Sequence, residues 1–374
     1  MNEELRSKLQ QQIHQAKNNM ITYEEYMNTV LYDSTCGYYM KHTQKIGREG
    51  DFITSSNISN VFGMLFAHVL MNTCKKNELP FIICEIGGGN GRFAKAILDE
   101  WEKLDQQSFS ALTYIIIETS PYHRQLQQEI LPIGKQVVQY ESIEEVIERF
   151  PNFEGIMISN ELFDAFPVRV VEKRDGQLYE VMVSMDEDHN LCERLCVTED
   201  QELSIYLQEQ KLVLADNQRF EVPLSMINYL NDMSTLIRRG VVFTVDYGYT
   251  NDEWMLPQYR RGSLRGYSNH KLIDNPLLHP GEMDLTTHIS FDAVQFYGDK
   301  YGLKFDKKLR QDEFLLAAGI LDFLQEHHDT NPFSEKSKQN RAIRSLIMGG
   351  GISEAFHVLI QKKGNTNMID FSAK

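Results

Sequence analysis

Near residue 85, an apolar stretch runs into a turn of glycines and then into a helical pattern. Residues 81–92 read Phe-Ile-Ile-Cys-Glu-Ile-Gly-Gly-Gly-Asn-Gly-Arg. Gly87, Gly89 and Gly91 allow the backbone to take positive φ angles and to approach a ligand closely, and the N–H groups that open the next helix face the turn. The pattern is typical of a loop that binds the polar end of a nucleotide-like cofactor, with a glycine loop of no function as the alternative.

The spacing of the glycines distinguishes between cofactors. Dinucleotide-binding turns read G-x-G-x-x-G, in which the third glycine lets the helix pack beside a pyrophosphate. Arg92 stands at that third position here. Glu85, just before the turn, offers a carboxylate to an ammonium group, and the N–H groups of the turn suit a carboxylate. The turn therefore favours S-adenosylmethionine, whose methionine end carries both groups, over NAD.

The charge of the chain limits its partners. Its 374 residues include 53 acids and 38 bases, a net charge of −15. This balance disfavours a nucleic acid as the partner and favours a basic or neutral substrate, in particular a basic protein segment.

Cysteine usage and the N-terminal region bear on the location of the protein. Five scattered cysteines indicate a reducing compartment and no disulfide framework, and Cys192 and Cys196 are too isolated for a zinc site. No apolar run is long enough to span a membrane, and residues 1–20 match neither a signal peptide nor an Arg-rich transit peptide. We therefore expect a cytoplasmic protein without a membrane span.

Strand and helix patterns alternate from about residue 80 onward, which indicates an α/β fold with a doubly wound, mostly parallel sheet. The expected strands are 81–86, 112–117, 136–138, 155–159, 241–246, 303–308 and 356–361. The expected helices are 92–104, 121–131, one opened by a capping box at Ser142, 202–214, 223–239 ended by Gly240, 290–301 and 313–325.

Two stretches interrupt this alternation. Residues 168–172 and 179–185 flank Arg174-Asp175-Gly176-Gln177, a hairpin turn signal, so we expect an inserted antiparallel piece after the fourth core strand. Residues 248–288 show no clear periodicity and are rich in Arg, Tyr, His, Pro and Gly. A long loop of this kind is functional or disordered, and its aromatic residues and histidines favour a function.

Open α/β sheets bind ligands at the carboxyl ends of their strands, so side chains at these ends are candidate ligands of the cofactor. Glu118 ends the second strand, where a carboxylate can accept hydrogen bonds from both ribose hydroxyls; an exposed strand-end acid is the alternative. Tyr140 ends the third strand, where it would contact the adenine or else belong to a solvated turn.

Asn160, Glu161 and Asp164 follow the fourth strand, where they would face the methyl group in transfer. Methyl transfer is an in-line displacement that mainly requires an oriented nucleophile and removal of a proton. Glu161 and Asp164, three residues apart, would lie on one side of a helical turn and could bind a guanidinium through parallel N–H···O bonds. The alternative is an acidic helix start favoured by the helix dipole.

Further polar residues follow the fifth strand and are candidates for substrate binding: Asp246, Tyr247, Arg265, His270, His279, Asp284 and His288. His279, Asp284 and His288 stand in a loop at spacings that are poor evidence for a metal site, so we expect no metal. The histidines would bind substrate, move protons or cap loop backbone, and these alternatives stay open.

Several strings resemble the MidA-like S-adenosylmethionine-dependent methyltransferases, a family that includes the mitochondrial arginine methyltransferase acting as a complex I assembly factor. The resemblance covers most of the chain. The strings that carry it are residues 22–27, 37–39, 50–55, 85–91, 160–167, 246–248, 265–266, 270, 280–281 and 284–286. Those at 50–55 and 160–167 are the most specific.

The resemblance implies a class I methyltransferase fold, a Rossmann-like sheet of strand order 3-2-1-4-5-7-6 with the last strand antiparallel, and S-adenosylmethionine as the cofactor. It also implies that Thr54 and Ser55 lie over the cofactor and that a protein side chain, with arginine favoured, accepts the methyl group. One departure is Gly88, where the family commonly has proline. Glycine there would make the loop more flexible without removing a cofactor contact.

The expected division of the chain is an N-terminal cofactor-covering segment at 1–56, a methyltransferase domain at 57–167 and 222–374 that includes the loop 248–288, and an inserted subdomain at 168–221. An active methyltransferase is the first hypothesis. A scaffold or assembly factor that binds the cofactor without transfer is the second. An NAD-dependent oxidoreductase is a third, disfavoured by Arg92.

Overall fold

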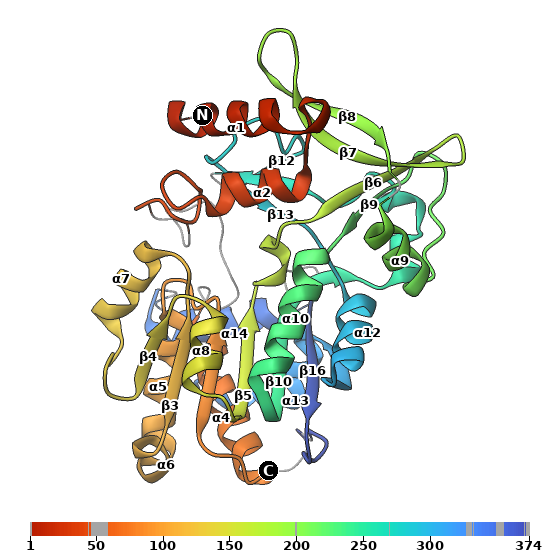
Figure 1. The fold of residues 1–374 in the computed structure, drawn as a ribbon. Helices are drawn as coiled ribbons and strands as arrows, with labels where there is room; N and C mark the ends of the chain where they lie inside the picture. Colours follow the sequence, from red (N-terminus) through yellow and green to blue (C-terminus); the bar gives the residue numbers. More distant parts are fainter. Residues whose placement is uncertain are drawn as a thin grey trace. The chain divides into compact units, whose positions relative to one another are not determined.

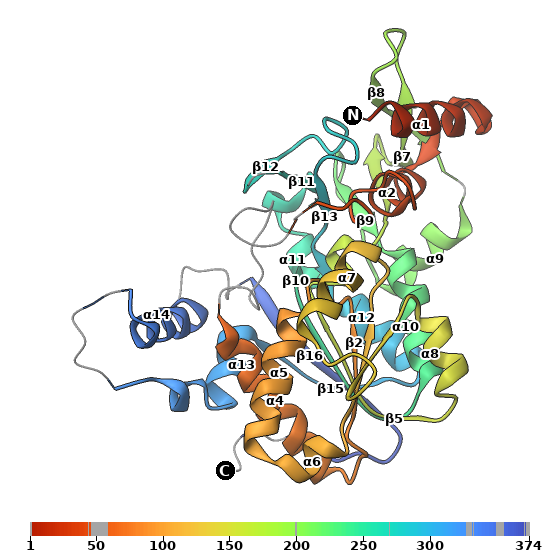
Figure 2. The ribbon, with the colours of Figure 1, turned by 90° about the vertical axis from the view of Figure 1, so that its left-hand side faces the viewer.

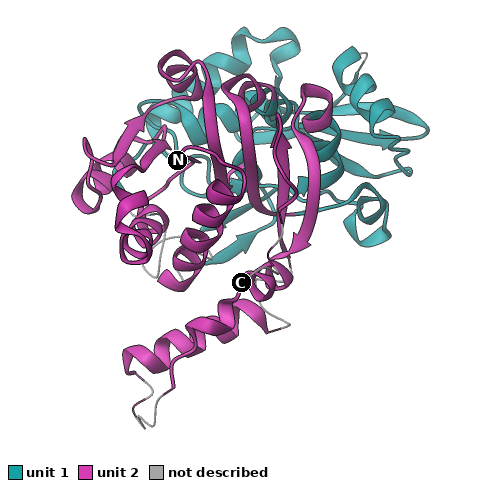
Figure 3. Ribbon diagram, turned by 90° about the horizontal axis from the view of Figure 1, so that it is seen from below, with its two compact units in different colours: residues 1–52, 163–230, 248–297 teal, residues 53–162, 231–247, 298–374 magenta. Residues whose placement is uncertain are grey.

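The computed structural model describes residues 2–43, 45, 59–198, 200–268, 270–326, 331, 333–348, 355–369 and 371. The chain forms two compact units, each assembled from three segments (Figure 3). Unit 1 comprises Met1–Phe52, Phe163–Leu230 and Gly248–Tyr297. Unit 2 comprises Ile53–Leu162, Asn231–Tyr247 and Gly298–Lys374.

Unit 2 is built on a sheet of strand order β15-β16-β10-β5-β2-β3-β4 (Figure 1). The strands are β2 (Ile82–Ile86), β3 (Thr113–Ile117), β4 (Val137–Tyr140), β5 (Phe153–Asn160), β10 (Ile237–Tyr249), β15 (Lys304–Arg310) and β16 (Phe356–Lys363). β16 is antiparallel to both of its neighbours, whereas the other pairs along this path are parallel. Counted in chain order the sheet reads 3-2-1-4-5-7-6, which confirms the predicted fold class.

Helices cover both faces of this sheet because their apolar residues recur at helical spacing. α4 (Asn60–Lys76) and α5 (Arg92–Leu104) lie on one face and α8 (Ile143–Arg149) lies on the other (Figure 2). Other helical segments of unit 2 are α6 (Gln106–Ser110), α7 (Pro121–Ile130), α13 (Gln311–Ala317), η4 (Ile320–Phe323) and α14 (Glu335–Ile347). Residues of both units form α10 (Leu224–Leu236) and α12 (Phe291–Tyr301).

Gly240 does not end a helix, as the sequence predicts, but lies inside a strand. α10 ends at Leu236, and β10 begins at the next residue. A Cβ atom on Gly240 would lie 1.9 Å from the carbonyl oxygen of Gly155 on β5, so only glycine lets these two strands pair here. The glycine therefore marks a close approach of two strands.

Helix capping or helix length differs from the prediction in three places, although α8 (Ile143–Arg149) begins after Ser142 as predicted. The Ser142 side chain does not cap α8; instead the Glu145 carboxylate accepts a hydrogen bond of 3.0 Å from the N–H of Glu141. The helix predicted at 313–325 stops at Ala317, because Gly319 takes a φ of 91° before η4 begins. The helix predicted at 202–214 is shorter and forms α9 (Gln201–Glu209) of unit 1.

Unit 1 is built on a smaller antiparallel sheet of order β1-β7-β6-β9, with β8 also paired to β7. Its strands are β1 (Ile21–Thr22), β6 (Arg169–Arg174), β7 (Gln177–Met185), β8 (Leu191–Val197) and β9 (Arg219–Val222). β6 and β7 form the predicted hairpin. α1 (Glu3–Gln15) and α2 (Tyr23–Tyr32) pack against β7 and bury a separate apolar core with it.

Residues 248–288 contain regular structure, so the expectation of a structureless loop is wrong. They hold α11 (Asn251–Trp254), the short helix η3 (Pro257–Tyr259) and a sheet of order β12-β11-β13. The strands are β11 (Arg265–Ser268), β12 (Lys271–Ile273) and β13 (Asp284–Thr286), and β14 (Ile289–Ser290) follows and pairs with the end of β10. Strands of three or four residues are too short for an alternating pattern to be recognised.

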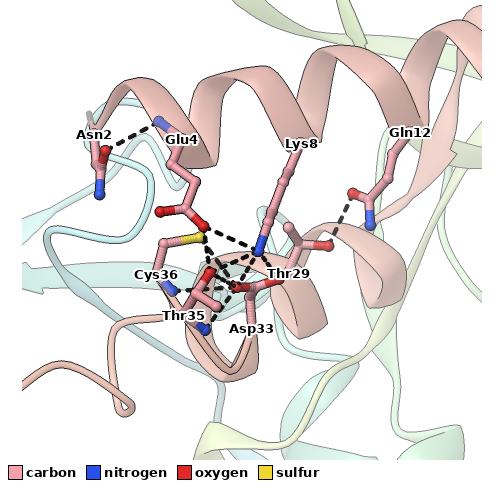
Figure 4. Close-up of polar contacts among 8 residues, drawn as sticks. All are labelled: Asn2, Glu4, Lys8, Gln12, Thr29, Asp33, Thr35 and Cys36. Carbon is pink, nitrogen blue, oxygen red and sulfur yellow. Dashed lines mark hydrogen bonds and ion pairs between the residues drawn. The ribbon is translucent and has the colours of Figure 1, made fainter.

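A polar cluster joins α1 to the end of α2 in unit 1 (Figure 4). The Lys8 ammonium lies 2.7 Å from both Asp33 Oδ1 and Thr35 Oγ1, and the Cys36 thiol donates to Asp33 at 3.1 Å. Burial raises the pKa of Asp33, but the hydrogen bonds from Lys8 and Thr35 outweigh burial and hold that pKa below its usual value. The carboxylate therefore stays ionised and links the two helices.

Candidate cofactor and acceptor sites

The glycine turn at the end of β2 has the backbone that the sequence predicts. Gly87, Gly89 and Gly91 take φ angles of 73°, 50° and 79°, a region that other residues rarely adopt. Gly91 is the N-cap of α5, so the free N–H groups of that helix follow the turn directly. At Gly88, a Cβ atom would lie 2.6 Å from Ile116 Cγ2, so this glycine also serves tight packing.

Glu118 holds the glycine turn from the end of the neighbouring strand β3. Its Oε2 accepts a 2.8 Å hydrogen bond from the N–H of Gly89, and its Oε1 accepts one of 2.8 Å from the N–H of Ser120. Each carboxylate oxygen can accept a further hydrogen bond, as a ribose hydroxyl would require. Glu118 is 8% exposed, so it is not the exposed strand-end acid of the alternative interpretation.

Gln127 is a residue of this turn that sequence reasoning missed. Its Nε2 donates to the carbonyl oxygen of Gly89 at 2.8 Å, and its Oε1 accepts from Gln139 at 2.6 Å. Gln127 is fully buried on α7, and its role is visible only in the structure, because no local pattern in the sequence marks it. Gly89 is thus held through its N–H by Glu118 and through its C=O by Gln127.

Glu85 precedes the turn as predicted, and it is almost fully buried. It accepts a 2.9 Å hydrogen bond from the Tyr114 hydroxyl. Burial, and to a smaller extent the nearby charge of Glu118, raise the pKa of Glu85 to about 8, although the Tyr114 hydrogen bond acts in the opposite direction. A cation such as the ammonium of S-adenosylmethionine would favour the ionised form.

The described contacts do not test the assignment of the other predicted cofactor residues, Tyr140, Thr54 and Ser55, to the cofactor. Tyr140 ends β4, where its half-buried ring lies edge-on to Phe150 at 6.2 Å and its carbonyl oxygen accepts from the N–H of Glu118. Thr54 and Ser55 lie outside the described residues. The positive-φ glycines, the helix N-terminus and the Glu118 carboxylate together fit the carboxylate and ribose groups of S-adenosylmethionine.

Asn160 and Glu161 lie at the carboxyl end of β5, next to the start of the glycine turn. Ile86 on β2 pairs with Ser159 on β5, so Gly87 and Asn160 follow at the same level of the sheet. Asn160 Nδ2 donates to Glu161 at 3.1 Å, and Asn160 Oδ1 is buried without a hydrogen-bond partner among the described residues. Such an oxygen requires a donor from water or a ligand.

Glu161 and Asp164 do not share a helical turn, so that prediction is wrong. Glu161 takes a left-handed φ of 53° and donates its N–H to the Val245 carbonyl oxygen at 2.9 Å. The helical turn is limited to η2 (Phe163–Ala165), which contains Asp164. Glu161 belongs to unit 2 and Asp164 belongs to unit 1.

Within unit 1, Asp164 and Asp284 come close to Tyr39. The Tyr39 hydroxyl donates to Asp284 Oδ1 at 2.6 Å, and the carbonyl oxygen of Asp164 accepts from the N–H of Thr287 at 2.8 Å. Burial raises the pKa of Tyr39 well above its usual value, and the charges of Asp284 and Asp164 add to this effect. Tyr39 stands in one of the family strings, but sequence reasoning did not select it as a site residue.

His288 and Arg265 also belong to unit 1. The His288 ring stacks on Tyr249, with the ring centroids 4.6 Å apart and the planes 8° apart. Burial, and then the charge of Arg265, lower the pKa of His288 to about 3, so the imidazole is neutral near pH 7. Arg265 Nε donates to the Ser263 carbonyl oxygen at 2.7 Å.

Glu221 on β9 organises this region and was also missed. Its buried carboxylate accepts hydrogen bonds from the N–H groups of Ser263 and Leu264, and Ser263 Oγ in turn accepts from the N–H of His288 at 2.9 Å. A Cβ atom on Gly262 would lie 2.1 Å from Glu221 Oε1. Glu221 therefore orients the segment that carries Arg265.

The remaining candidates are scattered. Asp246 is fully buried in β10 and accepts from the N–H of Tyr247, whose ring lies 5.2 Å from that of Phe356. His270 and His279 lie at exposed turn positions of unit 1. Among the described residues, no three histidine, cysteine, aspartate or glutamate side chains are grouped so that they could hold a metal ion.

A comparison with protein families agrees with the cofactor half of this geometry. The profile of a family of S-adenosyl-L-methionine-dependent methyltransferases matches residues 63–308. The chain belongs to this methyltransferase family. The match confirms the resemblance to MidA-like methyltransferases and the cofactor that the glycine turn predicts, whereas the assignment of individual site residues stays a prediction.

Two solved structures resemble the chain over its whole length. A COG1565 superfamily member from Burkholderia thailandensis, bound to S-adenosyl-homocysteine, superimposes with a TM-score of 0.89 at 26% identity and covers 100% of this chain and 95% of that chain. A native structure of a COG1565 superfamily protein from the same organism gives a TM-score of 0.85 with the same identity and coverage.

The chain matches only part of the length of its curated relatives. The protein arginine methyltransferase NDUFAF7 homolog, mitochondrial, of Drosophila melanogaster is 28% identical over 304 residues, which are 74% of this chain and 66% of the relative. Protein arginine methyltransferase NDUFAF7, mitochondrial, of Homo sapiens is 26% identical over 306 residues, 74% of this chain and 65% of the relative. The chain thus spans about two thirds of the length of these relatives.

The names of these relatives correct one prediction. They are mitochondrial proteins by name, so the expectation of a cytoplasmic methyltransferase is wrong. Within the part of the chain that the structure describes, no helix is long and apolar enough to cross a membrane.

Proposed function

We propose that the protein transfers the methyl group of S-adenosylmethionine to a nitrogen of a protein side chain, with an arginine guanidinium as the acceptor. The observation that carries the proposal is the place of Asn160 and Glu161. Both follow β5 at the level where the glycine turn follows β2, and Asn160 Oδ1 is a buried acceptor atom without a partner among the described residues. An N–H group of the acceptor would satisfy this oxygen.

The comparisons support the choice of acceptor. The fly and human relatives are named protein arginine methyltransferases. The net charge of −15 supports a basic protein segment around the target side chain, because opposite charge raises the rate of encounter.

The proposed roles follow from the chemistry of each residue. When bound, S-adenosylmethionine would supply an electrophilic methyl group on its sulfonium for in-line transfer to a guanidinium nitrogen, with the sulfur as the leaving group. Glu118 binds the ribose hydroxyls while it holds Gly89, and Asn160 Oδ1 orients one N–H of the acceptor. Glu161 balances the positive charge of the guanidinium and takes up the proton that the nitrogen loses.

Calorimetric titration with S-adenosylmethionine and with NAD, followed by labelled methyl transfer to arginine-containing basic peptides, tests the proposal. Glu118→Ala should weaken cofactor binding about 30-fold, since two hydrogen bonds to a carboxylate are lost. Glu161→Ala should bind the cofactor normally and transfer at least about 100-fold more slowly. Glu148→Ala, an exposed acid on α8, is the matched control and should change neither quantity.

Two outcomes would contradict the proposal. Binding of NAD without binding of S-adenosylmethionine would remove the cofactor assignment. Tight binding of S-adenosylmethionine without transfer to any basic peptide or protein would favour a scaffold or assembly factor that keeps the fold but has lost catalysis.

A further inference from the structure

The helix α14 of unit 2 differs in charge from the rest of the chain. Glu335–Ile347 contains four cations, Lys336, Lys338, Arg341 and Arg344, and one acid, Glu335, whereas the whole chain carries a net charge of −15. All four cations are exposed. Glu335 forms a 2.8 Å ion pair with Lys338, and the helix itself carries four positive charges against this one negative charge.

The basic residues of α14 face outward because the apolar residues on the opposite side of the helix are buried in the core of unit 2. Ala342, Ile343 and Leu346 are 9%, 0% and 1% exposed, and the helix packs against α13, η4 and α4. Lys338, Arg341 and Arg344 are each three residues apart and therefore share the other face. Figure 2 shows α14 outside α13 and farther from the sheet than α4 and α5.

Two large apolar side chains flank this basic face and are unusually exposed. Phe333 precedes α14 and is 74% exposed, and Met348 follows it and is 62% exposed. Of the described large apolar residues, only Val213 and Met368 are exposed to a similar degree. Exposed apolar residues are normal when scattered singly. Here the two stand at the two ends of one basic helix, so charged and apolar side chains occur together on this element.

We propose that the outer face of α14 binds an anionic lipid surface. Cations between apolar anchors match the layering of a membrane, in which headgroup phosphates lie above the acyl chains. An acidic protein segment would satisfy the cations but would not in itself cover Phe333 and Met348. At physiological salt the Debye length is about 8 Å, so charges close to a surface contribute most to contact with it.

Sedimentation of the full chain with vesicles tests this surface without involving cofactor or transfer, so its outcome is independent of the proposed function. The vesicles are phosphatidylcholine alone or with about one third phosphatidylglycerol, at about 0.1 M salt. We expect binding only to the anionic vesicles, and weaker binding as salt rises.

Three variants separate charge from apolar anchoring. Arg341→Glu with Arg344→Glu should lower binding at least about 25-fold, since each basic residue near such a surface contributes about fivefold. Phe333→Ser with Met348→Ser should also weaken binding but leave its salt dependence unchanged. Lys17→Glu with Lys135→Glu makes the same change in net charge at exposed positions outside α14 and should bind like the parent.

Unchanged cofactor affinity and circular dichroism will show that the variants are folded. Equal binding to neutral and anionic vesicles, or equal loss in the α14 and control charge variants, overturns the proposal. Failure of the parent protein to bind anionic vesicles also overturns it, in favour of an acidic protein partner for this face.

Discussion

Different kinds of contact stabilise the interior of each unit of this protein. Unit 2 depends on close backbone approach within its sheet, where Gly155 and Gly240 meet across β5 and β10. Unit 1 depends on polar side chains that join segments far apart in the chain, such as Tyr39 with Asp284, 245 residues away. A substitution at a close backbone approach should therefore damage the fold most, whereas a change of protonation at one polar side chain should act on a single link.

Glycine substitutions are the strongest test of this difference. Gly240→Ala should lower the free energy of unfolding by about 5 kcal/mol, because the new Cβ meets the backbone oxygen of Gly155, which cannot move aside. Gly262→Ala in unit 1 should lower it by only about 2 kcal/mol, because the obstacle is the side chain of Glu221.

Urea unfolding measures these changes. Gly134→Ala is the control, since Gly134 has a φ of 80° but nothing within 4 Å of the added Cβ. It should cost about 1 kcal/mol, the effect of a left-handed φ alone. If Gly240→Ala costs no more than this control, close strand approach is not what stabilises unit 2.

The buried carboxyl group of Glu85 should make unit 2 less stable as pH rises. Its pKa of about 8 in the folded protein lies above the ordinary value of 4.5, so between these values only the folded state keeps the proton. The free energy of unfolding should then fall with rising pH across this window, by on the order of 3 kcal/mol, and level off above pH 8. Urea unfolding at pH 5 and pH 8 measures the change.

Glu85→Gln is the variant that isolates this effect, because glutamine does not titrate and can keep the hydrogen bond from Tyr114. The stability difference between parent and variant should change with pH between about 5 and 8. A constant difference would mean that Glu85 is already ionised in the folded protein, and the burial argument would fail.

His288 should give unit 1 the opposite dependence on pH. Its pKa of about 3 in the folded protein lies below the ordinary value of 6.5, so between these values only the unfolded state is protonated. The stabilisation is present above pH 6.5 and is lost as pH falls toward 3, by on the order of 3 kcal/mol. His288→Asn should remove this loss in urea unfolding at pH 4 and pH 7. If the free energies of unfolding of parent and variant change equally between pH 4 and pH 7, His288 does not cause the loss.

The distance along the chain between contacting residues explains how much of the fold and of the site could be predicted from the sequence. The strands and helices of unit 2 are long enough to show their periodicity, and Glu118 could be selected because a strand end is a local feature. Tyr39 and Glu221 act on partners that are distant in the chain, and no local pattern marks them. Gln127 reaches Gly89 across 38 residues and was missed for the same reason.

The error at Glu161 has a different physical origin. The spacing of Glu161 and Asp164 suits a helix, but the backbone of Glu161 is left-handed and its N–H is bound to the carbonyl oxygen of Val245 in β10. A contact between two strands thus overrode a local preference. The roles of Asn160 and Glu161 in transfer, and of Thr54 and Ser55 over the cofactor, stay predictions.

Helix capping should give the smallest change in the free energy of unfolding. One N-cap residue in each unit can be compared, Thr22 in unit 1 and Ser142 in unit 2. Thr22 in unit 1 forms a capping box: its Oγ1 accepts from the N–H of Glu25, and the Glu25 carboxylate accepts from the N–H of Thr22. Thr22→Ala should therefore lower the free energy of unfolding by about 1 kcal/mol. Ser142 in unit 2 makes no such bond, so Ser142→Ala should change it by less than about 0.5 kcal/mol. Equal losses in urea unfolding would restore the capping box that the sequence predicts at Ser142.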